Sequence, residues 1–140
     1  MKAFTAPLRE LAEFEEIYKE KRKKPRMLLL SGCVTSQKTH MIYALSDGCP
    51  CTLIVLSNEE KAKQMYEEYR FLDENVCYYP AKDLLYYQAD IHGKLLIKQR
   101  MEVVQRLIES NEAGSEEKSA SIITTFDALM DFLMPIEEIE

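Results

Sequence analysis

One stretch near the N-terminus, Arg26-Met-Leu-Leu-Leu-Ser-Gly-Cys-Val-Thr-Ser-Gln-Lys-Thr39 (RMLLLSGCVTSQKT), decides the expected fold. Its first half is a short, continuous apolar run that ends at Gly32, as expected of a strand buried on both faces of a parallel sheet. Its second half, Gly32 to Thr39, stands where a phosphate loop of the form G-x-x-x-x-G-K-[ST] lies between such a strand and a helix. We therefore expect residues 26–31 to form the first strand of an α/β sheet.

The phosphate loop is degenerate, because Gln37 stands where its second glycine is required. That glycine lets the backbone turn without a Cβ and lets phosphate approach the main-chain N–H groups closely. A left-handed conformation at Gln37 would cost about 1–2 kcal/mol, and its side chain would occupy the space of the anion. Lys38 and Thr39 still stand at the positions of the phosphate-binding lysine and the magnesium-binding hydroxyl.

ATP hydrolysis also needs an apolar strand that ends in acidic residues, and the sequence offers none. Asp73-Glu74 follows a predicted helix, and the apolar run that ends at Thr125 continues with Phe-Asp and no second acid. Three interpretations remain open: a vestigial phosphate loop, which we favour, an ordinary strand-to-helix turn, and a functional nucleotide site. No catalytic, cofactor-binding or metal-binding residue is expected. The residues of the vestigial loop are Gly32, Ser36, Gln37, Lys38 and Thr39.

Short apolar runs and amphipathic segments alternate along the rest of the chain. Strands are also predicted at 52–57, 76–79 and 120–125, helices at about 8–24, 38–46, 59–72, 95–110 and 126–133, and a loop with a helical turn at 81–93. Alternating strands and helices imply right-handed crossovers and one parallel sheet with helices on both faces. The predicted fold class is an α/β, P-loop-type (RecA-like) parallel sheet flanked by helices, in truncated form. We expect an N-terminal helix and basic linker at 1–25, the α/β subdomain at 26–134, and the cut start of a further segment at 135–140.

The composition disfavours several classes of protein. The chain has 140 residues, of which 46% are hydrophobic and 30% charged, as in one globular domain. Its net charge of -6 disfavours autonomous nucleic-acid binding, and the basic run 19–26 fits a solvated helix end better than a phosphate-contacting patch. The four cysteines form no C-x-x-C pair, so no zinc site is expected. Without a signal-peptide pattern or a membrane-length apolar run, a cytoplasmic location is expected.

Four blocks of the sequence carry a family resemblance. They are Gly32 to Thr39 between its predicted strand and helix, Tyr79-Pro-Ala-Lys-Asp83, the pair Gln99-Arg100 within 95–107, and Ile122 to Met130 (IITTFDALM). Together they resemble the N-terminal region of the bacterial transcription-repair coupling factors, Mfd. In that family, a fold similar to the first domain of the excision-repair protein UvrB carries a degenerate phosphate loop. The short link between residues 73 and 76 leaves no room for the tyrosine-rich, damage-probing hairpin of UvrB, so the chain is more similar to Mfd than to UvrB.

The resemblance implies that this chain is a non-catalytic, UvrB-like scaffold domain. Its parent would be an ATP-dependent DNA translocase, with a helicase motor that uses ATP and magnesium, which displaces stalled RNA polymerase and recruits UvrA for nucleotide excision repair. The implied partners are UvrA, through a module that continues beyond residue 140, and RNA polymerase and DNA, through other domains. Intramolecular packing is also implied, and no membrane partner. The alternative, from the residues alone, is a small P-loop nucleotide-binding or phosphotransfer domain that uses Lys38 and Thr39.

Overall fold

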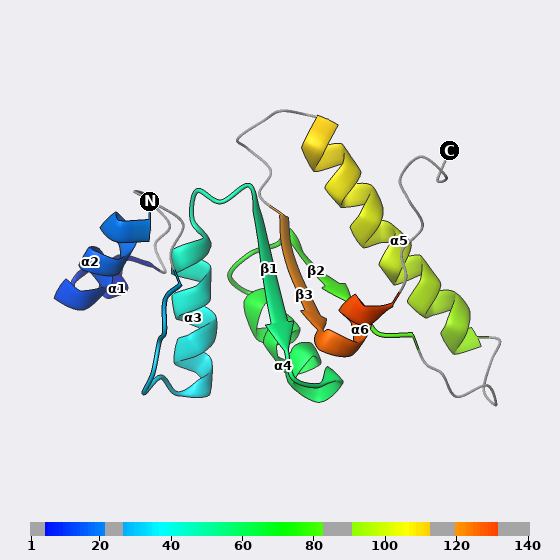
Figure 1. The fold of residues 1–140 in the computed structure, drawn as a ribbon, viewed down its shortest axis with the longest axis horizontal. Helices are drawn as coiled ribbons and strands as arrows, with labels where there is room; N and C mark the ends of the chain where they lie inside the picture. Colours follow the sequence, from blue (N-terminus) through cyan, green and yellow to red (C-terminus); the bar gives the residue numbers. More distant parts are fainter. Residues whose placement is uncertain (1–4, 22–26, 83–90, 113–119, 132–140) are drawn as a thin grey trace.

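The described part of the chain is an α/β protein with a parallel sheet flanked by helices (Figure 1). The structure, a computed structural model, describes residues 5–21, 27–82, 91–112 and 120–131. Its elements follow the order α1 Ala6–Arg9, α2 Ala12–Lys21, α3 Thr35–Ser46, β1 Cys51–Leu56, α4 Glu59–Tyr69, β2 Val76–Tyr79, α5 Ile91–Glu112, β3 Ala120–Thr125 and α6 Phe126–Met130. The predicted fold class is thus confirmed at the level of an α/β sheet with flanking helices.

The described strands form one sheet in the order β1-β3-β2, and both pairings are parallel. β3 is the central strand, and all six of its residues are buried, which explains its continuous apolar character. Its register joins Ile123 to Ile54 on one side and to Tyr78 on the other. The three strands predicted downstream of residue 50 are confirmed to within one residue at each end.

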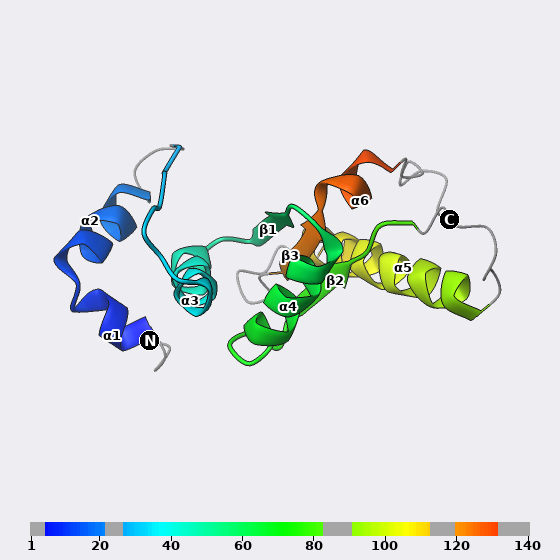
Figure 2. The ribbon, with the colours of Figure 1, turned by 90° about the horizontal axis from the view of Figure 1, so that it is seen from below.

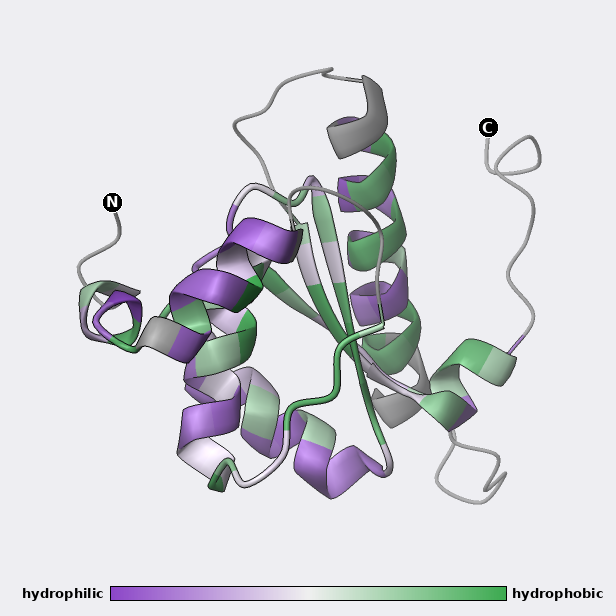
Figure 3. Cartoon of the chain, turned by 60° about the vertical axis from the view of Figure 1, so that its left-hand side comes forward, coloured by the Kyte–Doolittle hydropathy of each residue, from purple (hydrophilic) through white to green (hydrophobic). Residues whose placement is uncertain are grey.

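Helices pack on both faces of the sheet (Figure 2). On one face, α4 contacts all three strands, and Ile54, Tyr69 and Ile123 share a core cluster with it. On the other face, α5 packs on β2 and β3 through Val103 and Ile122. The strands at the centre of Figure 3 are mostly hydrophobic, whereas the surrounding helices alternate between hydrophobic and hydrophilic turns. None of the helices in the described ranges is both long and apolar enough to cross a membrane.

The N-terminal segment forms two short helices instead of the single predicted one. Pro7 lies at the start of α1, as expected, but the helix ends at Arg9, and α2 begins at Ala12. Leu8 and Phe14 are six residues apart, so one continuous helix would place them about 120° apart around its axis. The break lets both side chains bury against Met41 and Ala44 of α3.

The prediction of a strand at residues 26–31 was wrong for residues 27–31, which are the part of this segment that the structure describes. Residues 27–31 form no strand, and Met27, Leu28 and Leu29 are exposed to 100%, 52% and 88%. Within the described sheet, β1 and β2 flank β3, and residues 27–31 pair with neither of their outer edges. An apolar run shows that a segment can form a buried strand, but whether it pairs with a sheet depends on packing with the rest of the chain. The segment that was expected to carry the phosphate loop therefore lies outside the described sheet.

Candidate functional site

The predicted phosphate-loop residues lie in a connection and in the first turns of α3. Gly32 has a φ of +80°, in the left-handed region that favours glycine, and a Cβ at this position would meet no atom within 4 Å. Val34 caps α3 in an extended conformation, and the Lys38 N–H donates to the Val34 carbonyl oxygen at 3.0 Å. The side chains of Ser36, Gln37 and Lys38 are exposed. The loop therefore turns into the helix as predicted but keeps these side chains in solvent.

Gln37 is an ordinary helical residue, and the strain expected of it is not present. In the described ranges, glycines are the only residues with a positive φ. α3 already begins at Thr35, so position 37 lies within the first helical turn. A left-handed backbone would be needed only if the loop wrapped closely around an anion at this point.

The hydroxyl of Thr39 contacts the neighbouring helix α4. Its Oγ1 donates to Oε2 of Glu68 at 2.7 Å and lies 3.2 Å from Sδ of Met65. Thr39 is only 3% exposed, so this contact is closed to solvent on the threonine side. Nε2 of Gln64 donates to the other oxygen of Glu68 at 3.1 Å. The residue at the magnesium-binding position of a phosphate loop thus links α3 to α4.

A groove of about 500 Å³ lies between α3 and α4 beside this contact. Ser36, Thr39 and His40 line it from α3, and Gln64, Glu67, Glu68, Phe71 and Leu72 line it from α4 and the turn that follows. A phosphate in this groove would face the carboxylates of Glu67 and Glu68, and like charges repel. Lys38, which would neutralise a phosphate, is not among the described residues that line the groove.

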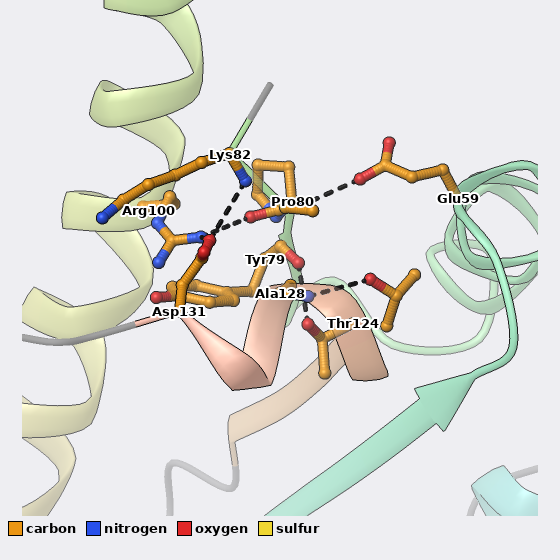
Figure 4. A network of polar contacts seen from close by, with 10 residues as sticks. Glu59, Tyr79, Pro80, Lys82, Arg100, Thr124, Ala128 and Asp131 are labelled. Carbon is orange, nitrogen blue, oxygen red and sulfur yellow. Dashed lines mark hydrogen bonds and ion pairs between the residues drawn. The ribbon is translucent and has the colours of Figure 1, made fainter. Parts of the chain in front are cut away.

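A second polar cluster lies where β2 and β3 end (Figure 4). Nη1 of Arg100, from α5, donates to the carbonyl oxygen of Pro80 at 2.8 Å and pairs with Oδ2 of Asp131 at 2.9 Å. The same Asp131 oxygen accepts the backbone N–H of Lys82 at 3.1 Å. The Arg100 guanidinium also lies 4.3 Å from the centre of the Tyr79 ring. Arg100 is 6% exposed, so its charge is balanced by Asp131, the carbonyl and the ring within the protein.

Other elements hold the same segment after β2 from the opposite side (Figure 4). Oε1 of Glu59, at the start of α4, accepts the N–H of Ala81 at 3.0 Å. Oγ1 of Thr124, in β3, donates to the carbonyl oxygen of Tyr79 at 2.9 Å. The carboxyl ends of parallel strands are where α/β sheets commonly bind ligands. Here the protein's own side chains hold residues 79–82 at this edge, and we call this arrangement the β2 clamp.

Three ionisable groups near the β2 clamp, Glu59, Tyr78 and Tyr79, have shifted pKa values. Partial burial alone would raise the pKa of Glu59, but the Ala81 N–H, the nearby Tyr78 hydroxyl and the Lys63 ammonium together hold it below its usual value. Burial raises the pKa of Tyr78, and the Glu59 carboxylate raises it further. Burial also raises the pKa of Tyr79, against the opposing effect of Arg100. These tyrosines therefore stay neutral, and Glu59 stays ionised.

Cys77 is a buried thiol without the properties of a nucleophile. Burial raises its pKa, although Nη1 of Arg106 lies 3.2 Å from its Sγ and acts in the opposite direction. A reactive cysteine needs a lowered pKa and access to its substrate. Within the described ranges, no group of three or more histidine, cysteine or carboxylate side chains is placed to hold a metal ion.

Sequence reasoning found part of each site. It named Thr39 and began a predicted helix at residue 59. It also quoted Tyr79 to Asp83 and Gln99-Arg100 as separate blocks, without their contact; Asp83 lies outside the described residues. It missed Glu68 and Asp131, because no local pattern marks an acid whose partner is 29 or 31 residues away.

The chain matches no family model, no curated protein and no solved structure. Its function has to be inferred from its own residues and geometry.

Replacing Arg100 with Met tests the β2 clamp. The Arg100→Met side chain keeps an apolar stem over Tyr79 but leaves Asp131 without its cation, so the free energy of unfolding should fall by about 3 kcal/mol. The matched variant Lys98→Met removes a 73% exposed lysine from the same helix and should cost less than about 1 kcal/mol. Urea unfolding measures both. Equal effects would show that the clamp contributes nothing specific to stability.

Replacing Glu59 with Gln tests the ionised carboxylate of the same clamp. Its lowered pKa means that Glu59 stabilises the fold above the usual pKa of 4.5, and that this contribution is lost as pH falls through the folded-state pKa. Glu59→Gln should therefore be less stable than the original protein at about pH 7, and the difference should shrink towards about pH 3. Urea unfolding at both pH values checks this. The control is Glu60→Gln, an exposed acid in the same helical turn. If the difference in the free energy of unfolding between Glu59→Gln and the original protein does not change with pH, the expected contribution of the ionised carboxylate is contradicted.

Proposed function

We propose that this chain is a non-catalytic α/β scaffold that docks other proteins, as the UvrB-like domain of a transcription-repair coupling factor. The observation that carries the non-catalytic part is the 2.7 Å hydrogen bond from Thr39 to Glu68. A phosphate loop uses the hydroxyl at this position for magnesium and the start of the helix for phosphate. In this chain the Glu68 carboxylate lies against the same helix and accepts the hydrogen bond of the Thr39 hydroxyl.

Electrostatics support the absence of nucleotide binding. A phosphate charge at about 4 Å from a carboxylate is repelled by about 4 kcal/mol at the effective dielectric near a protein surface. Binding ATP and magnesium in the manner of a phosphate loop would also have to break the link between Glu68 and the 3% exposed Thr39. Lys38 offsets little of this, because its side chain is exposed and lies outside the groove.

The β2 clamp supports the scaffold part of the proposal. Arg100 and Pro80 belong to two blocks that carry the family resemblance, and a 2.8 Å hydrogen bond joins them. A fixed corner at the edge of the sheet suits a domain that presents neighbouring surfaces better than one that opens to admit a substrate. In the proposed cytoplasmic parent, ATP and magnesium would serve the motor, and UvrA, RNA polymerase and DNA would bind through its other modules.

An ATP titration tests the non-catalytic function. In the presence of millimolar magnesium, calorimetry should show no saturable ATP binding to this chain, and Lys38→Ala should behave identically. A phosphate-release assay should give the same background rate for both proteins. Micromolar ATP affinity that is lost in Lys38→Ala would overturn the proposal in favour of a nucleotide-binding or phosphotransfer domain that uses Lys38 and Thr39.

The family assignment has a separate test in the coding sequence. We expect the reading frame to continue past residue 140 and to encode helicase motifs, because the proposed parent carries an ATP-driven motor. Sequencing of the complete gene and its transcript checks this. A reading frame without a motor domain would remove the repair assignment and leave only the α/β scaffold.

A further inference from the structure

The groove between α3 and α4 carries an exposed aromatic side chain that the proposed function has not used. Phe71 lines this groove and is 81% exposed, beside the half-buried Leu72. Single exposed apolar side chains are common on protein surfaces, but a large ring at the lip of a groove provides surface for an apolar ligand. The groove thus has an apolar wall on the side of the turn after α4.

The groove also has a charged wall, which is formed by Glu67 and Glu68 of α4. Glu68 accepts hydrogen bonds from Thr39 and Gln64, and both of these donors are neutral, so they orient the carboxylate without cancelling its charge. Glu67 lies 3.4 Å from Arg70, but both side chains are more than half exposed, and such pairs are weak. The guanidinium of Arg70 also lies 5.7 Å from the centre of the Tyr66 ring, and neither of these residues lines the groove. The groove is therefore negative as well as apolar.

We propose that this groove docks a basic and partly apolar segment of a partner protein. An arginine or lysine of that segment lays its apolar stem on Phe71 and directs its cation to the carboxylates of Glu67 and Glu68. A neighbouring aliphatic side chain of the segment packs beside Leu72. The same two acids repel nucleic acid, and an apolar wall offers no ligands to a bare metal ion. A protein segment with basic and apolar side chains is therefore the occupant that fits both walls.

This inference rests on the proposed docking function and specifies its partner. The probe is a fluorescein-labelled peptide, Leu-Arg-Lys-Leu-Arg-Lys-Leu, titrated with the full chain and followed by fluorescence anisotropy. Two variants remove the groove's recognition elements, Glu67→Gln combined with Glu68→Gln, and Phe71→Ser. The matched control, Glu102→Gln combined with Glu109→Gln, makes the same change of charge at exposed positions of α5. Circular dichroism and thermal unfolding verify that each variant folds.

The expected result is saturable binding that weakens about tenfold in both groove variants and less than about twofold in the control. Amide signals of residues 36–40 and 64–72 should shift in NMR spectra on addition of the peptide. Equal weakening in the control would reveal non-specific attraction to an acidic protein and overturn the inference. An undiminished affinity in Phe71→Ser would overturn it too.

Two further outcomes identify other occupants. Sedimentation that shows a dimer, dissociated by the Glu67 and Glu68 substitutions, would mean that the basic run 19–26 of a second copy fills the groove, which overturns the partner proposal. Shifts of the same NMR signals with inorganic phosphate instead of the peptide would overturn it in favour of an anion site.

Failure of this inference can be told apart from failure of the proposed function. If neither ATP nor the peptide binds, this inference alone is lost. If ATP binds tightly through Lys38, the proposed function is lost whatever the peptide does.

Discussion

The pairing of both edges of β3 is the constraint on which the rest of the described fold depends. Because β1 and β2 each pair with β3 in parallel, the connections after β1 and β2 must cross over the sheet. The helix α4 makes the first crossover, on one face, and α5 lies in the second, on the other. All six residues of β3 are buried as a result. Its carboxyl end then meets that of β2, which brings Thr124 against the Tyr79 carbonyl and allows the β2 clamp to form.

The link between Thr39 and Glu68 connects the N-terminal helices to this sheet. α1 and α2 pack on α3, and α3 in turn contacts α4, which lies on the sheet. The hydrogen bond between Thr39 and Glu68 is one of the polar contacts in that chain of packing. It has two consequences at the same place: it engages the Thr39 hydroxyl, and it keeps the Glu68 carboxylate at the wall of the groove between α3 and α4. The proposed absence of nucleotide binding and the proposed docking groove thus both depend on this contact.

Periodicity predicted most of the fold, because the strands after residue 50 and the helices between them are set by local patterns. The helix predicted at 59–72 is present as α4, and Ala62 and Tyr69 within it are fully buried. The failures share one cause, which is that their outcome depends on residues far along the chain. Residues 27–31 pair with no strand of the described sheet, and the N-terminal helix broke to bury Leu8 and Phe14 on one surface. Glu68 and Asp131 gained their roles only through partners about thirty residues away. The predicted boundaries of 1–25, 26–134 and 135–140 stay predictions.

The exposed run Met27 to Leu30 has a consequence for the solubility of the protein. Four consecutive apolar residues outside a sheet form a segment that can pair with identical segments of other molecules and start aggregation. Natural sequences restrain such segments with flanking charges and prolines, which act as gatekeepers. The residues Lys21-Arg-Lys-Lys-Pro-Arg26 stand directly before this run. The charges and the proline of this basic run have the composition of such a gatekeeper, which involves no nucleic acid.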